Sequence, residues 1–324
     1  MAPLLEVKNL KTHFFTENGV VKAVDDVSFH VDVGETLAIV GESGSGKSIT
    51  AMSILRLIPN PPGEIVNGEI IFEGDNILEM NDEEIMDLRG NKIAMIFQEP
   101  MTSLNPVLTV GRQIAEPIEL HRQTPLAKAI NMAKDLLRKV RIAEADKRVN
   151  SYPHQFSGGM RQRVMIAMGM ACEPKLIIAD EPTTALDVTV QAQLLELLKE
   201  LTREGSSSLI LITHDLGVVA RYADRINVMY GGKIVESGTA LEIFERPKHP
   251  YTIGLMESIP KLDQDTREKL IPIEGSPPNL ADVPPGCAFN PRCKFTTDKC
   301  KVDTPVLEPV GSNHYKACWI DVER

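Results

Sequence analysis

The sequence predicts an α/β fold with a mainly parallel sheet, followed by a loop-rich C-terminal segment. Short apolar runs that end in glycine or an acidic residue alternate with segments of helical pattern, as in ETLAIVG, KLIIADE and SLILITHD. This alternation is typical of parallel sheets, because a parallel connection usually crosses over through a helix. Prolines gather from about residue 251 onward, which indicates an appended segment rich in loops.

Composition narrows the class of protein. The chain has 324 residues, 43% of them hydrophobic, and is long enough for one large or two medium domains. Its net charge of -10 argues against nucleic acid as a partner, since phosphate binding requires a basic face. The N-terminus lacks a signal-peptide pattern, and no apolar run approaches the roughly 18 residues of a membrane span. Five cysteines do not resemble a disulfide-dense secreted domain, so we expect a reducing compartment.

The elements follow one another in a recognisable order. Residues 4–40 predict short strands joined by turns, and residues 47–58 predict a helix. The runs GEIIFEGDNI and KIAMIFQ predict strands on either side of an acidic segment, and helical patterns indicate a helical subdomain at about 102–165. RINVMYGGKIVESG predicts a hairpin across Gly231 and Gly232. We therefore expect one domain over 1–250 and an extension over 251–324.

GESGSGKS, at residues 41–48, fits the phosphate-binding pattern G-x-x-x-x-G-K-[ST] and lies between a predicted strand and a predicted helix. Glycines let backbone N–H groups turn inward around phosphate oxygens, and the helix N-terminus adds its positive dipole end. Lys47 is expected to reach the β- and γ-phosphates and Ser48 to bind Mg²⁺. The residues that we assign to this nucleotide site are Gly41, Ser43, Gly44, Ser45, Gly46, Lys47, Ser48 and Ile49.

An acidic pair follows a second predicted strand, as a phosphate-binding loop of this type requires. In KLIIADE, four apolar residues precede Asp180 and Glu181. Asp180 is expected to hold the Mg²⁺ ion, and Glu181 to polarise the attacking water. The pair therefore predicts hydrolysis of a nucleoside triphosphate.

Further motifs point to one family of such hydrolases. FSGGMRQR (156–163), Gln98 after a strand, ADEPTTALD (179–187) and His214 in LILITHD occur in that order together with the phosphate-binding loop. Over residues 4 to about 250 this arrangement resembles an ATP-binding cassette (ABC) ATPase. The resemblance implies an ABC-type fold with an N-terminal antiparallel β subdomain, a helical subdomain and the parallel core sheet. It also implies two ATP molecules bound between the subunits of a head-to-tail dimer.

The resemblance also assigns roles to single residues. Ser157, Gly158 and Gly159 would face the γ-phosphate of ATP bound by the other subunit, from a helix N-terminus. Asp187 would line the same interface.

His214 would contact the γ-phosphate and orient water with Glu181, and Gln98 would reach Mg²⁺. Phe14 matches the aromatic position that stacks on adenine, with His13 and Phe15 as neighbours able to take that role; a place in the core is the alternative for Phe14.

The C-terminal segment indicates which class of substrate is transported. HPYTIGLMESIP, IEGSPPNL, PPGCAFNPRC and HYKACW resemble the C-terminal extension of ATPases from oligopeptide and dipeptide importers. The resemblance implies a peripheral subunit at the cytoplasmic face of the membrane. Its implied partners are two integral membrane permease subunits, a second ABC ATPase (identical or related) and, indirectly, an extracytoplasmic peptide-binding protein. The segment QEPMTSLNPVLTV after Gln98 would face the permease. Import of nickel or a sugar, and a redox-regulated switch for a non-transport partner, are the alternatives.

Four cysteines gather near the end of the chain with the spacing C-x5-C-x6-C-x17-C; they are Cys287, Cys293, Cys300 and Cys318. Zinc sites usually contain a C-x2–4-C pair, which is missing here, whereas iron–sulfur clusters accept varied spacing. We therefore predict a 4Fe–4S cluster, with zinc, disulfides or free thiols as alternatives. A bound metal would stabilise a short, proline-rich segment that buries little surface. A redox switch that regulates transport is a further hypothesis. Cys172, inside an apolar helical run, is expected in the core.

Overall fold

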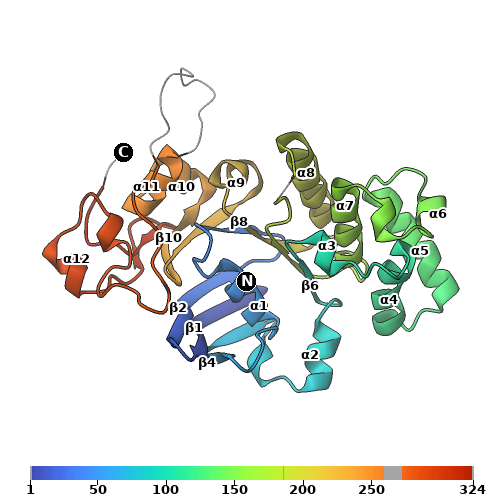
Figure 1. Cartoon of the computed structure of the whole chain (residues 1–324), viewed down its shortest axis with the longest axis horizontal. Helices are drawn as coiled ribbons and strands as arrows, with labels where there is room; N and C mark the ends of the chain where they lie inside the picture. Colours follow the sequence, from blue (N-terminus) through green and yellow to red (C-terminus); the bar gives the residue numbers. More distant parts are fainter. Residues whose placement is uncertain (1, 185, 259–271, 323–324) are drawn as a thin grey trace. The chain divides into compact units, whose positions relative to one another are not determined.

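The computed structural model describes residues 2–184, 186–258 and 272–322 (Figure 1). The chain divides into two compact units. Unit 1 comprises residues 1–31, 36–78 and 212–324, and unit 2 comprises residues 32–35 and 79–211. The phosphate-binding loop and the C-terminal extension both belong to unit 1. The helical segment and the acidic pair belong to unit 2.

Unit 1 contains an antiparallel sheet in the order β2–β1–β4–β5. Figure 1 labels β2, β1 and β4 of this sheet. Its strands are β1 (Leu5–Thr16), β2 (Gly19–Val31), β4 (Gly63–Phe72) and β5 (Asp75–Asn76). Along β1, Leu5 and Val7 are buried two residues apart, as side-chain alternation in a strand requires. The register with β2 then shifts near Asn9, whose φ is 47°, and the buried face resumes at Leu10. This bulge lets one long strand keep its apolar side chains on one face.

The remaining strands of unit 1 lie in the order β11–β12–β10–β9–β3. They are β3 (Thr36–Val40), β9 (Arg225–Tyr230), β10 (Lys233–Thr239), β11 (Glu308–Pro309) and β12 (Tyr315–Lys316). β3 and β9 pair in parallel, and β9 and β10 form the predicted hairpin. Gly231 and Gly232 turn it with φ values of 56° and 78°, in the region that favours glycine. β8 (Ser208–Thr213) contains the boundary between the units.

Helices of unit 1 begin at clear local signals. α9 (Leu216–Tyr222) is capped by Asp215 and α10 (Ala240–Glu245) by Thr239, in a capping box with Glu242. α11 (Pro250–Glu257) starts with proline at its first position, and the side chain of His249 accepts a hydrogen bond from the Tyr251 N–H. The other helical segments are α1 (Lys47–Ile54), η3 (Asn290–Arg292) and α12 (Asp298–Val302), and η1 (Ile77–Glu79) contains a boundary between the units.

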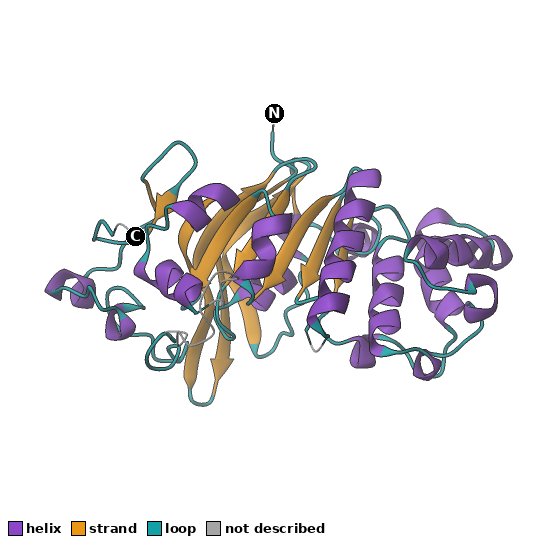
Figure 2. Ribbon diagram, turned by 90° about the horizontal axis from the view of Figure 1, so that it is seen from above, coloured by secondary structure: helices purple, strands orange, loops and turns teal. Residues whose placement is uncertain are grey.

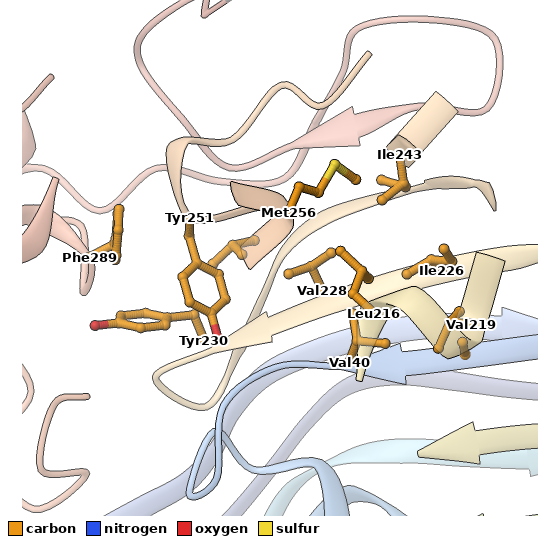
Figure 3. Packing of buried hydrophobic residues seen from close by; sticks show 12 residues of the cluster. Val40, Leu216, Val219, Ile226, Val228, Tyr230, Ile243, Tyr251, Met256 and Phe289 are labelled. Carbon is orange, nitrogen blue, oxygen red and sulfur yellow. The ribbon is translucent and has the colours of Figure 1, made fainter. Parts of the chain in front are cut away.

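A hydrophobic cluster joins β3, β9 and β10 to α9, α10, α11 and the extension (Figure 3). Val40 and Val228 contribute from the strands, and Ile243 from α10. Tyr251 from α11 and Phe289 from the extension complete the cluster beside the strands. Each fully buried side chain of this size contributes about 1.5–3 kcal/mol, so the cluster is a main source of stability for this part of unit 1.

The extension, over residues 272–322, is mostly loop, as the left side of Figure 2 shows. It is tied to β10 by its short strand β12, in which Tyr315 and Lys316 pair with Ser237 and Glu236. The imidazole of His314 also lies 2.7 Å from the carboxylate of Glu236, and both side chains are buried. A few polar anchors therefore hold a segment that has little regular structure.

Unit 2 contains the parallel strands β6 (Ile93–Ile96) and β7 (Leu176–Asp180), together with a group of helices (Figure 1). Its helical segments are α2 (Asp82–Leu88), α3 (Pro100–Ser103), α4 (Val110–Arg122), α5 (Leu126–Lys139), α6 (Ala145–Arg148), η2 (Pro153–Gln155), α7 (Gly158–Gly169) and α8 (Val188–Glu204). α4 and α5 bury one apolar face each, with Ile114 and Ile118 on α4 and Ala133 and Leu137 on α5. This spacing of three or four residues makes them amphipathic.

The predicted α/β class is confirmed: both units contain a parallel strand pair, and unit 1 carries the antiparallel β subdomain. The N-terminal strands are longer than expected, because β1 and β2 continue through their bulges. Cys172 is buried as predicted. Within the part of the chain that the structure describes, no helix combines the length and apolar character needed to cross a membrane. The predicted domain limits, 1–250 and 251–324, stay a prediction.

Candidate functional site

The phosphate-binding loop connects β3 to α1, the setting that its sequence predicts. Gly41 has a φ of 154°, and a Cβ there would lie 2.2 Å from the backbone oxygen of Met229. Gly46 has a φ of 106°, and a Cβ there would lie 2.4 Å from the oxygen of Ala23. Because no side chain fits at either position, the loop can follow this path only with glycine.

Lys47 is held inside the loop. Its Nζ donates hydrogen bonds to the carbonyl oxygens of Gly41 (2.8 Å) and Glu42 (2.9 Å), and its side chain is buried. Ser45 and Gly46 are also buried, whereas Ser48 and Ile49 are half-buried. Ser43 and Gly44 are exposed at the tip of the loop. The structure thus fixes the cation beside a loop whose tip faces solvent.

The candidates for adenine stacking lie at the end of β1. Phe14 is half-buried, and its ring is so close to Gly63 that a Cβ there would lie 2.8 Å from the Phe14 ring. Phe15 is 49% exposed. The Nε2 atom of His13 is buried without a hydrogen-bond partner, and burial lowers the pKa of this imidazole. Phe15 therefore has more free surface than the predicted Phe14.

His214 follows β8 directly, as predicted, and is exposed. The next residue, Asp215, caps α9, and its backbone N–H donates a hydrogen bond to Oγ1 of Thr213 (3.1 Å). These local bonds define the turn that presents the imidazole of His214.

In unit 2 the acidic pair stands at the end of β7. Asp180 is buried, and Glu181 has a φ of 44°, an uncommon backbone conformation for glutamate. Nε2 of Gln98 donates a hydrogen bond to Oε2 of Glu181 (2.9 Å), and Oγ1 of Thr184 donates another (2.9 Å). The structure thus brings Gln98 and Glu181 together. Strained backbone of this kind is concentrated at functional sites.

The second glycine motif opens α7. Ser157 is the N-cap, and its Oγ accepts a hydrogen bond from the N–H of Met160, while Gly158 and Gly159 are the first residues of the helix. Ser157 and Gly158 are exposed. The first N–H groups of a helix lack partners within it and carry the positive end of its dipole. This N-terminus can therefore receive an anion.

Asp187 caps α8 by accepting a hydrogen bond from the N–H of Val190 (3.0 Å). Val190 in turn approaches the start of α7, since a Cβ on Gly159 would lie 3.1 Å from its side chain. Asp187 and the glycine motif are thus joined through neighbouring helix N-termini.

The four clustered cysteines line a single cavity in the extension, as their grouping in the sequence indicates. Burial raises the pKa of Cys287 to about 11, and it also raises the pKa of Cys293 and Cys318. At neutral pH these thiols therefore carry their protons, which a metal would have to displace.

The fit of a metal at these thiols is only partial. The donor set suits an iron–sulfur cluster, but the cavity is about 10 Å³ in volume, roughly the room that one water molecule needs. Among the described residues, no group of three or more His, Cys, Asp or Glu is placed to hold a metal ion. The cavity in this structure is therefore too small for the predicted 4Fe–4S cluster, and no zinc site is formed among the described residues. The five cysteines are free thiols.

Sequence reasoning missed three residues at these sites. Thr184 lies in the same acidic block and binds Glu181, so its position near the motif was the available signal. Arg292 and Tyr251, both from the C-terminal region, bind Glu42 inside the phosphate-binding loop. The negative charge of Glu42 in an anion-binding loop indicates a cationic partner without indicating which residue supplies it. No sequence signal points to Tyr251.

Two family models match the chain. One, described as ABC transporter, matches residues 24–184, and the other, described as the C-terminal region of oligopeptide/dipeptide transporters, matches residues 235–300. The oligopeptide transport ATP-binding protein OppD of Bacillus subtilis is 52% identical over 98% of this chain and 88% of its own length. OppD of Haemophilus influenzae is 51% identical over 100% of this chain and 99% of its own length.

The chain belongs to the ATP-binding proteins of peptide ABC transporters. Members of this family are ATPases that couple ATP hydrolysis to transport and work with membrane permeases. The fold agrees with solved cassettes. A dimeric ATP-binding cassette, MJ0796, bound to ADP and phosphate superposes with a TM-score of 0.65 at 28% identity, over 73% of this chain and 98% of that chain. CbiO1 of Clostridium perfringens gives a TM-score of 0.64 at 26% identity, over 75% of this chain and 91% of that chain.

Proposed function

We propose that this ATPase powers the import of di- and oligopeptides through a pair of integral membrane permease subunits, as a peripheral subunit on the cytoplasmic face of the membrane. The observation that carries the proposal is the chain's C-terminal region, whose match to the oligopeptide/dipeptide transporter family covers residues 235–300. A peptide-binding protein outside the membrane would deliver the substrate. The ATPase would not itself touch the peptide.

The proposed working form is a head-to-tail dimer with ATP between the subunits. Its support is that one chain carries both a phosphate-binding loop and an exposed, glycine-rich helix N-terminus at Ser157, Gly158 and Gly159. In this arrangement the second motif and Asp187 face the γ-phosphate held by the other subunit. The second subunit is an identical chain or a related one.

Each proposed residue has one task in hydrolysis. Gly41, Ser43, Gly44, Ser45, Gly46, Lys47, Ser48 and Ile49 would bind the triphosphate, and Phe14 or its neighbours would stack on adenine. Ser48, Asp180 and Gln98 would hold Mg²⁺, which neutralises phosphate charge when bound. Glu181 would accept a proton from the attacking water, and His214 would orient that water. The bond from Gln98 to Glu181 supports a shared role for these two side chains.

Glu181→Gln tests the assignment of the base. We expect ATP turnover to fall by at least about a hundredfold, because general-base catalysis contributes that much or more. ATP binding should persist and stabilise the dimer, which size-exclusion chromatography with light scattering would detect. The control is Glu204→Gln at the exposed end of α8, which should leave turnover unchanged. Near-normal turnover in Glu181→Gln would refute the role of Glu181.

Co-purification from membranes tests the transport function. We expect a tagged chain to bring down integral permease subunits, and ATP turnover by that complex to rise when peptide-loaded binding protein is added. A soluble partner instead would favour the alternative, a redox-regulated switch outside transport. Stimulation by nickel or a sugar in place of peptides would change the substrate class.

We also propose that the four thiols of the extension take a 4Fe–4S cluster, with zinc as the alternative. The support is that Cys287, Cys293, Cys300 and Cys318 line one cavity, which would have to enlarge to hold a cluster. Protein purified without oxygen should contain about four irons and four sulfides per chain, and it should lose them in Cys300→Ser. Stoichiometric zinc, or no metal, would overturn the cluster.

A further inference from the structure

The phosphate-binding loop is held from outside by an arginine of the C-terminal extension. Nη1 and Nη2 of Arg292 donate to the two carboxylate oxygens of Glu42, at 2.7 Å and 3.1 Å. This two-point geometry is the strongest form of an Arg–carboxylate pair. The Arg292 side chain is 5% exposed and that of Glu42 is 27% exposed, so water screens the pair weakly.

Further hydrogen bonds hold the guanidinium of Arg292 in this position. Its Nε donates to the carbonyl of Glu274 (2.9 Å), and Nη2 also donates to the carbonyl of Ile273 (3.3 Å). Nη1 reaches the hydroxyl of Tyr230 at 3.3 Å as well. The hydrogen bond to Glu42 is the main cause that raises the pKa of Arg292. Arg292 is thus a fixed charge whose remaining donors are satisfied by the surrounding chain.

A tyrosine holds the backbone of the same loop residue. The N–H of Glu42 donates to the hydroxyl of Tyr251 at 2.8 Å. The Tyr251 ring is fully buried, with its centroid 4.5 Å from that of Tyr230 and 5.4 Å from that of Phe289 (Figure 3). Burial raises the pKa of Tyr251, so the hydroxyl keeps its proton.

Glu42 also forms hydrogen bonds with two residues inside the phosphate-binding loop. Its carbonyl oxygen accepts hydrogen bonds from Nζ of Lys47 (2.9 Å) and from the N–H of Ser45 (3.2 Å). Glu42 therefore bonds the extension through its side chain, α11 through its N–H, and the loop interior through its carbonyl. A shift of Glu42 would move Lys47 and Ser45 with it.

The charge of Glu42 adds a second effect. A carboxylate in a loop that binds phosphate repels the incoming anion, the more so where water is scarce. The positive charge of Arg292, from the C-terminal extension, neutralises the carboxylate of Glu42.

We propose that Arg292 and Tyr251 are positioning residues for nucleotide binding, which makes the C-terminal extension a working part of the ATP site. They hold Glu42 in place, and Arg292 neutralises its carboxylate. This inference goes beyond the peptide-import function proposed above, because it concerns only the affinity of the loop for ATP.

The test measures ATP affinity in the full-length chain, with a fluorescent ATP analogue and Mg²⁺. Arg292→Met should raise the Kd about tenfold, since a hydrogen-bonded charge of this kind is worth roughly that factor. Arg292→Lys should recover part of the loss, because it restores the charge without the two-point geometry. Tyr251→Phe keeps the ring and removes the acceptor for the Glu42 N–H, so about a threefold rise is expected. The control is Arg246→Met, an exposed arginine after α10, which should leave the Kd unchanged.

A double variant separates charge neutralisation from general stability. Glu42→Gln with Arg292→Met removes both charges, and we expect its Kd to return to within about threefold of the wild type; the rise that remains reflects the lost hold on Glu42. If Arg292 served only to hold the extension, Arg292→Met would lower Tm and leave the Kd unchanged, which would overturn the inference. A raised Kd that Glu42→Gln does not lower would overturn the neutralising role of Arg292. Strong ATP binding by the wild type in the same experiment keeps the ATPase assignment independent of this outcome.

Discussion

The phosphate-binding loop and the C-terminal extension lie in the same unit but keep their shapes by different means. The loop depends on its own backbone, because Gly41 and Gly46 occupy positions where a Cβ would collide with neighbouring carbonyl oxygens. The extension has little regular structure and depends on side chains that reach distant partners, such as His314 to Glu236. The difference teaches that a local motif can specify a binding loop, whereas a loop-rich segment needs long-range anchors.

The largest expected effect concerns the glycine backbone that shapes the phosphate-binding loop. Gly41→Ala should lower the free energy of unfolding by about 4 kcal/mol, because it combines a backbone clash with a strained φ. ATP binding should also be lost. Gly34→Ala is the matched control, since Gly34 also has a positive φ (75°) but no atom within 4 Å of the new Cβ. Its cost should be about 1 kcal/mol, measured by denaturant unfolding. Equal costs would show that the close contact at Gly41 is unimportant.

The next effect tests an anchor of the extension. His314→Ala leaves the buried carboxylate of Glu236 without one of its partners, and we expect a loss of about 3 kcal/mol. The N–H groups of Lys248 and His249 still bind Glu236, so unfolding should remain cooperative. His314→Gln keeps a donor at this place and should recover most of the loss. Thermal unfolding monitored by circular dichroism would measure both variants.

A smaller effect appears in the pH dependence of stability. Burial lowers the pKa of His249 to about 4, below the value of about 6.5 expected in the unfolded chain. A lowered folded-state pKa stabilises the protein above pH 6.5, and this contribution is lost as the pH falls from 6.5 toward 4. Between pH 6.5 and 5 the loss should be about 1.5 kcal/mol.

His249→Asn removes this titration while its side chain can still accept the hydrogen bond from the Tyr251 N–H at the start of α11. The free energy of unfolding of the variant should therefore depend less on pH over this range. An unchanged slope in urea titrations at several pH values would contradict the assignment to His249.

The smallest effect belongs to an exposed ion pair of the extension. Lys301 and Asp298 lie 3.1 Å apart on α12, with side chains 57% and 100% exposed. Lys301→Ala should change the free energy of unfolding by less than about 0.5 kcal/mol, because water screens such pairs. A large effect here would mean that the extension is stabilised by surface charges as well as by its buried anchors. Chemical denaturation would decide between the two.

Sequence reasoning reached those features that depend on neighbours in the chain. The phosphate-binding loop, the hairpin at Gly231 and Gly232 and the helix start at Ser157 each carry a local signal in residue type and spacing. The cysteines were predicted to converge because they are close in sequence, and they do line one cavity. The volume of that cavity depends on side-chain packing, which cannot be predicted from the spacing of the cysteines in the sequence.

Features that depend on distant residues were not predictable. Arg292 and Glu42 are 250 positions apart, and the connecting chain has no pattern that would align them. The bulge near Asn9, which lets β1 continue for 12 residues, likewise depends on pairing with β2 and β4. In both cases tertiary contacts decide the local outcome.

The pairing of β12 with β10 also bears on how the protein avoids self-association. The N–H of Ala317 donates to the carbonyl of Val235, and the ladder continues at Glu236 and Ser237, so the outer side of β10 is occupied. Without this strand, β10 would offer unpaired backbone groups to the sheet of another molecule. The outermost strand, β11, has only two residues, one of them Pro309, which cannot donate a hydrogen bond. The C-terminal extension thus also protects this sheet edge against edge-to-edge aggregation.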